Sequence, residues 1–125
     1  PPRSTLFPYT TLFRSGQGAL GIENRKGDEA VSEFIKPLID SKTMTEVLAE
    51  RAMNAALEGS CSVAIAGYAA TMGEELLLKG LVGNVESGSI LRSENTGSIS
   101  QPGALGELVA NQLLAIGAGK LLEGV

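Results

Sequence analysis

Apolar side chains recur at helical spacing in three parts of this 125-residue chain. The first predicted helix runs from Asp28 to Ile39. The second runs from Thr43 to about Leu57, since Thr43 and Glu46 form a capping box and Gly59 is a natural end. The side chains expected to be buried are Val31, Phe34, Ile35 and Leu38 in the first helix, and Met44, Val47, Leu48, Ala52 and Ala55 in the second.

A third helix is predicted from about Pro102 to Ile116, and Gly117 is expected to end it. Three strand-like runs precede this helix and are separated by the turn sequences TMGE and NVESG. Because these connections are short, the strands are expected to form an antiparallel meander. The predicted strands are Cys61 to Ala69, Glu75 to Gly83 and Ser89 to about Thr96, and the apolar side of the third helix comprises Leu105, Leu108, Val109, Gln112, Leu113 and Ile116.

This order of elements predicts an α+β fold, in which helices pack on one face of a small three-stranded antiparallel sheet. A further strand is expected upstream of the first helix, around the apolar stretch from Ala19 to Ile22. Gly16, Gly18 and Gly21 in this region match the glycine pattern of dinucleotide-binding loops, which needs a strand before it and a helix after it. The surrounding sequence does not provide that context, so a glycine-loosened strand is the preferred interpretation.

The first fifteen residues, PPRSTLFPYTTLFRS, differ from the rest of the chain. They hold three of the five prolines and none of the fourteen acidic residues, and they repeat TLF without a helical or strand period. Residues 1–15 are therefore interpreted as a foreign or disordered leader. A targeting peptide is the alternative, but the apolar stretches are too short for a signal core.

Composition excludes several classes of function. Apolar residues make up 43% and charged residues 19%, which is typical of a globular chain of about one domain. One cysteine and no histidine disfavour a disulfide framework, a metal site and a catalytic triad. The net charge of −4 argues against nucleic-acid and membrane partners. With no apolar run of membrane-spanning length and no secretory signal, a cytoplasmic setting is expected.

The only cysteine, Cys61, lies in NAALEGSCSVAIAGYA, just after the second predicted helix. Taken by itself, a lone cysteine on an alternating strand is most often a small buried hydrophobic residue. A reactive thiol at the corner between helix and strand is the alternative. The helix C-terminus does not favour a thiolate there, because that end of the helix dipole is negative.

The sequence from Gly16 to Val125 resembles the porphobilinogen deaminase family, through GQGALGIE, AERAMNAALEGSCSVAIAGYA and LLLKGLVGN in this order, followed by the terminal amphipathic helix. The resemblance implies that Cys61 carries a dipyrromethane cofactor through a thioether. A thiol suits this role because it is a good nucleophile toward carbon and the thioether persists. By the same resemblance, Gln17, Gly18 and Ala19 line the cofactor pocket.

The family's reaction deaminates four porphobilinogen molecules and joins them into hydroxymethylbilane, a transferase step of heme biosynthesis carried out by a monomer. Family members bind the acidic arms of the substrate in an arginine-rich cleft and use an aspartate of the first domain, both upstream of the matched region. Outside the leader only Arg25, Arg51 and Arg92 remain, too few for that cleft. The resemblance thus implies a fragment that is inactive alone and contains no catalytic residue. It also implies two parts. Residues 16–42 are the strand and helix that end the upstream domain, and residues 43–125 are the cofactor-bearing domain.

A different class of function stays open on the residues alone. The chain could be a small α+β binding or regulatory module that uses its sheet face, with Cys61 as a core residue. On either interpretation Glu50 and Arg51 are expected to be structural, as a solvated or interdomain ion pair, and not catalytic.

Overall fold

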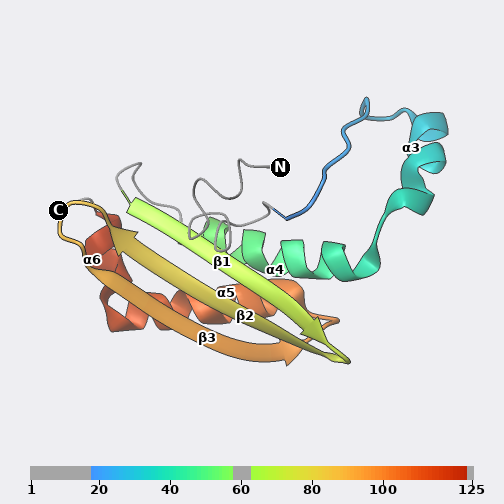
Figure 1. The fold of residues 1–125 in the computed structure, drawn as a ribbon. Coiled ribbons are helices and arrows are strands. Elements are labelled where there is room, and N and C mark those ends of the chain that lie inside the picture. The colour runs from blue at the N-terminus through green and yellow to red at the C-terminus, as the bar shows by residue number, and fades with distance from the viewer. Residues whose placement is uncertain (1–17, 58–62, 124–125) are drawn as a thin grey trace, which may run out of the picture.

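The computed structural model describes residues 18–57 and 63–123. It is an α+β arrangement in which a three-stranded antiparallel sheet of order β1-β2-β3 is packed on one face by two long helices, α4 and α5 (Figure 1). The elements are α3 (Glu29–Ile35), η1 (Lys36–Leu38), α4 (Ser41–Ala56), β1 (Val63–Met72), β2 (Glu75–Asn84), β3 (Ile90–Ser98), α5 (Pro102–Leu113), η2 (Leu114–Ala118) and α6 (Gly119–Leu122).

The predicted meander is confirmed, and local turn chemistry explains it. β1 and β2 are joined across Gly73, whose φ of 63° lies in the left-handed region that glycine adopts without strain. In the β2–β3 turn the side-chain oxygen of Asn84 accepts hydrogen bonds from the backbone amides of Glu86 and Ser87, both at 2.9 Å. The strands therefore follow the turn sequences, although β1 reaches Met72, three residues beyond its predicted end.

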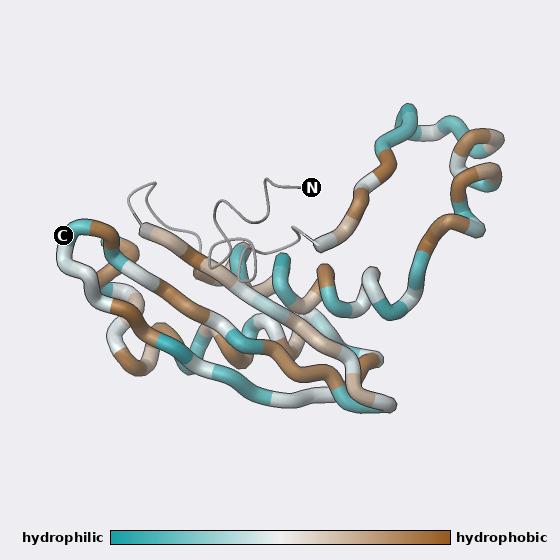
Figure 2. Tube along the Cα trace, viewed as in Figure 1, coloured by the Kyte–Doolittle hydropathy of each residue, from teal (hydrophilic) through white to brown (hydrophobic). Residues whose placement is uncertain are grey.

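The core lies between the sheet and the two helices. On β2, Leu76, Leu78 and Val82 are fully buried toward the helices, whereas Lys79 is exposed on the opposite face. In Figure 2 the brown hydrophobic stretches of β2 are interrupted by paler and teal residues. The other fully buried apolar residues of the core include Ala49, Met53, Val109, Ala110, Leu113 and Ala118.

Two predictions about the second helix, which is α4 in the structure, are wrong. The helix begins at Ser41, and Asp40 is the N-cap, accepting a hydrogen bond from the amide of Thr43, so the predicted Thr43–Glu46 capping box is wrong. The residues of α4 and its C-cap that are buried are Ala49, Glu50, Met53 and Leu57, not the predicted set that included Met44 and Leu48, which are each 45% exposed. The buried side is the one that meets both the sheet and α5, and residue spacing within α4 could not reveal it.

The upstream region also differs from expectation. The first predicted helix is present as α3 and η1, with Asp28 as the N-cap of α3 through a 3.2 Å bond from Val31 N. However, α3 and η1 have no buried residue, so the predicted apolar side is uncovered. Residues 18–28 contain no strand, because no neighbouring strand in the described part of the chain supplies the hydrogen bonds that a strand needs.

The C-terminal helix begins as predicted, with Pro102 in its first turn, but regular α-helix ends at Leu113. The segment η2 follows and is interrupted by a kink at Gly117, whose φ of 111° is not helical, in agreement with the prediction that Gly117 ends the helix; the chain then forms the short α6. Within the predicted apolar side, Leu105, Val109 and Leu113 are buried, but Leu108 and Ile116 are largely exposed. The leader (1–15), Gly16, Gly59 and the predicted start of β1 at Cys61 lie outside the described residues.

Candidate functional site

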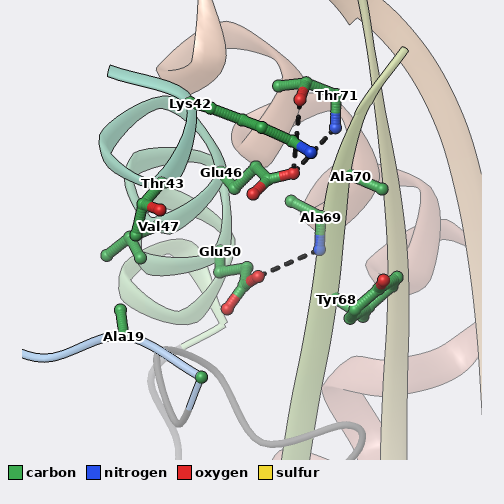
Figure 3. Close-up of a pocket in the computed structure, with 11 residues that line it drawn as sticks. Ala19, Lys42, Thr43, Glu46, Val47, Glu50, Tyr68, Ala69, Ala70 and Thr71 are labelled. Atoms are coloured by element: carbon green, nitrogen blue, oxygen red, sulfur yellow. Dashed lines mark hydrogen bonds between the residues drawn. The ribbon is translucent and has the colours of Figure 1, made fainter. Parts of the chain in front are cut away.

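A cavity of about 330 Å³ lies where the chain at Gly18 and Ala19 approaches α4 and the edge strand β1. Figure 3 shows Glu46 and Glu50 extending from the helix toward the strand. Helix α4 and the residues of β1 from Tyr68 to Thr71 supply most of the wall. The lining side chains from α4 are Lys42, Thr43, Glu46, Val47 and Glu50.

Two carboxylates of α4 cross from the helix to the strand. Glu50 accepts a hydrogen bond from the backbone amide of Ala69 at 3.0 Å, and Glu46 accepts one from the amide of Thr71 at 2.8 Å (Figure 3). Glu50 is only 8% exposed, so its charge is held in the wall and is not a solvated surface charge. Hydrogen bonds of this charge-assisted type are among the stronger ones in proteins.

The expected pairing of Glu50 with Arg51 is not seen. Glu50 faces β1 and is buried, whereas Arg51 is exposed, because consecutive helical residues point about 100° apart. In the described residues the ion pair found within 4 Å is Lys36–Glu33, at 3.5 Å on α3 and η1, away from the cavity. The Lys42 ammonium at the cavity is therefore not part of an ion pair within residues 18–57 and 63–123.

The N-terminal end of α4 borders the same cavity. The Thr43 hydroxyl and the Thr43 backbone amide both donate to the carboxylate of Asp40, and these bonds hold the pKa of Asp40 below its usual range. The bonds fix the first turn of the helix, and Thr43 in turn lines the cavity. Asp40 itself is exposed, so its role is to cap the helix.

The structure locates two of the four residues predicted to contact a cofactor. Gly18 and Ala19 line the cavity, and a β-carbon added at Gly18 would meet no atom within 4 Å. Gln17 and Cys61 lie outside the described residues; in sequence, Cys61 falls on the connection between α4 and β1. Sequence reasoning missed Lys42, Glu46 and Tyr68 as cavity residues, although the spacing of Lys42, Glu46 and Glu50 at i and i+4 places them along one side of the helix.

A second hollow, of about 530 Å³, lies over β2 and β3 and is lined by Lys79, Gly80, Leu81, Arg92, Ser93 and Glu94. In the part of the chain that is described, no group of three histidine, cysteine, aspartate or glutamate residues is arranged to hold a metal. Nor does any helix there have the length and apolar character needed to cross a membrane.

The fold and the cavity define a small α+β domain with a candidate ligand site beside an edge strand. Residues 44–115 match the family model described as "Porphobilinogen deaminase, C-terminal domain". The chain belongs to the porphobilinogen deaminase family.

Two relatives illustrate the match. The chain is 51% identical over 108 residues to a protein named porphobilinogen deaminase from Ruthia magnifica subsp. Calyptogena magnifica. It is 47% identical over 108 residues to a protein of the same name from Vesicomyosocius okutanii subsp. Calyptogena okutanii (strain HA). Each alignment covers 86% of this chain but 36% of the relative, so the chain spans about a third of the length of the relatives it matches.

Proposed function

We propose that this chain is the cofactor-bearing C-terminal part of an enzyme that deaminates four porphobilinogen molecules and joins them into hydroxymethylbilane. The observation that carries the proposal is the family match over residues 44–115, a stretch that includes Cys61. Cys61 is proposed as the thioether anchor of a dipyrromethane cofactor. A thiol is the side chain best suited to form a lasting bond to carbon near neutral pH.

The charges of the cavity bear on how such a cofactor is held. A dipyrromethane that carries acetate and propionate arms needs cations around it. The cavity at Gly18 and Ala19 offers one, Lys42, and two carboxylates, Glu46 and Glu50. The residues that line this cavity therefore do not fit the acidic arms of this group, and in the proposed enzyme those arms are bound by cations contributed from outside this cavity.

The helix α3 supports the proposed division of the chain. Val31, Phe34 and Leu38 on α3 and η1 are 41%, 85% and 68% exposed, although they form the apolar side of an amphipathic helix. A helix of this kind is normally stabilised by packing its apolar side against another element. We therefore assign residues 16–42 to the end of an upstream domain and residues 43–125 to the cofactor-bearing domain. The proposed boundary falls within the first turn of α4, which begins at Ser41.

The test of the proposed function is the intact mass of the chain expressed together with family-type upstream domains. A covalent dipyrrole adduct on the parent protein, absent from Cys61→Ser, supports the proposal. An unmodified thiol supports the alternative of a binding module in which Cys61 is a core residue. A Cys61→Ser protein that still carries a dipyrrole would contradict Cys61 as the anchor.

The 125-residue chain by itself is expected to form no hydroxymethylbilane from porphobilinogen. A positioned acid–base group is worth about two to four orders of magnitude in rate, and the family places that group upstream of the matched region. Product formation above the rate without protein would contradict this expectation.

A further inference from the structure

Strand β1 is an edge strand, and part of its free edge is occupied by a helix. Within residues 18–57 and 63–123, the strand order β1-β2-β3 leaves one side of β1 without a neighbouring strand. In an antiparallel pair the amides of a strand point alternately toward the partner and away from it. Since Ala69 and Thr71 donate to side chains of α4, theirs are the amides that point away from β2.

The two acceptors match the two donors in spacing. Glu46 and Glu50 are one helical turn apart, which corresponds to a rise of about 6 Å along α4. Ala69 and Thr71 are two residues apart, which is about 6.7 Å along β1. Because α4 and β1 run in opposite directions here, Glu50 meets Ala69 at 3.0 Å and Glu46 meets Thr71 at 2.8 Å.

These bonds provide acceptors for backbone amides at the edge of the sheet. Unpaired strand edges expose backbone donors that otherwise pair with another chain. Glu50 is 8% exposed and Ala69 is 4% exposed, so this donor and this acceptor satisfy each other away from water. A carboxylate offers two oxygens and accepts strongly, whereas an apolar residue at either helix position would leave the amide of the strand unsatisfied.

We propose that Glu46 and Glu50 are positioning residues that take the place of a fourth strand and fix β1 along α4. These two elements flank the connection that contains Cys61, so their alignment sets where the two ends of that connection lie. The consequence for the thiol rests on the proposed function; the fixing of β1 by the two carboxylates does not.

The first experiment measures amide hydrogen exchange on the 125-residue chain. Two double variants are compared with the parent: one replaces Glu46 and Glu50 by alanine, and its matched control replaces both by glutamine, which keeps an oxygen acceptor. Exchange at Ala69 and Thr71 is expected to become about tenfold faster or more with alanine and to stay near the parental rate with glutamine. The amide of Ala70, which alternation directs toward β2, should remain protected in all three proteins.

Unchanged exchange at Ala69 and Thr71 in the alanine variant would overturn the proposal. If the double alanine variant does not fold, the single variants Glu46→Ala and Glu50→Ala replace it, and each should release only its own amide. Release of both amides by either single change would show general unfolding of the strand and would also overturn the proposal.

The second experiment uses the chain joined to family-type upstream domains and measures by intact mass the fraction that carries a pyrrole adduct. The fraction is expected to fall severalfold in the alanine variant and to be restored in the glutamine variant. Loading of the alanine variant to the parental level would contradict the positioning role. A parent protein with no adduct would instead contradict the proposed function, and the exchange experiment would still decide whether the two carboxylates fix β1.

Discussion

Gly106 of α5 lies directly against the carbonyl oxygen of Ala49 on α4, so that a β-carbon at this glycine would come within 2.6 Å of that oxygen. The same β-carbon would lie 2.8 Å from the backbone nitrogen of Met53. Because these atoms belong to the backbone of the neighbouring helix, they cannot turn aside as a flexible side chain can. The two helices that cover the sheet therefore touch through a position that tolerates only glycine.

Gly106→Ala is accordingly expected to destabilise the chain by about 1–3 kcal/mol, since forcing an extra methyl group into a well-packed contact displaces the helices. Gly103→Ala on the same helix is the matched control. Its β-carbon would meet no atom within 4 Å, and alanine favours helix, so this change should leave stability equal or raise it by up to about 1 kcal/mol. Thermal unfolding of the three proteins measures the difference. Equal midpoints for the two variants would show that α4 and α5 are not in close contact.

The strands were more predictable from the sequence than the helix faces were, for a physical reason. Alternation and turn residues such as Gly73 and Asn84 act within a few positions, so they define the meander locally. The buried side of α4 depends on α5, which follows some fifty residues later, and the helical spacing of Met44 and Leu48 could not identify it. Glu46 shows the same limit: its spacing suggested a cap, but its partner is Thr71 on β1.

The resemblance in sequence assigned Gly18 and Ala19 to a cofactor pocket. Both residues line the cavity beside α4 and β1, and their role toward a cofactor stays a prediction. The resemblance could not reveal Lys42 and Tyr68, because their contribution arises only when α4 and β1 are packed side by side. Helical spacing groups Lys42 with Glu46 and Glu50 on one side of α4, but it does not show that this side faces β1.

Asn54 on α4 allows a test of whether a buried polar atom without a hydrogen-bond partner lowers stability. Its side-chain oxygen is buried and has no hydrogen-bond partner in the described part of the chain, which typically costs about 1–3 kcal/mol. Asn54→Leu replaces the amide with an apolar group of similar shape and is expected to raise stability by about 1 kcal/mol. Asn111→Leu on α5, where the side chain is exposed, controls for the better helix propensity of leucine. A lower unfolding midpoint for Asn54→Leu than for the parent would show that this oxygen has a partner.

The lowered pKa of Asp40 predicts how the stability of the chain depends on pH. Hydrogen bonds from Thr43 hold the pKa of Asp40 below its usual range, so the folded state favours the ionised form. Its contribution to stability is therefore present above the unfolded-state pKa of about 4 and is lost as the pH falls through the lower pKa of the folded state. Asp40→Asn retains a good N-cap without the charge. The thermal unfolding midpoint of the parent should exceed that of Asp40→Asn near pH 7, and this difference in midpoint should disappear as the pH falls below about 4.

Asp40→Ala separates the cap from the charge, because it removes the acceptor at every pH. Its midpoint should stay below that of Asp40→Asn across the whole range. A gap between parent and Asp40→Asn that is constant from pH 7 to pH 3 would contradict the lowered pKa.

The uncovered side of α3 gives the last prediction. Phe34 is 85% exposed, so Phe34→Ser should leave the thermal midpoint of the 125-residue chain unchanged. If residues 16–42 pack on an upstream domain, the same substitution in a chain that carries family-type upstream domains should lower stability by about 1.5–3 kcal/mol, the usual value for burying a phenylalanine. Glu33→Ser, the preceding and exposed position on α3, is the matched control and should have little effect in either protein. Equal responses to Phe34→Ser in the short and the long chain would show that this side of α3 has no partner upstream, and the division of the chain at residues 42 and 43 would lose its structural support.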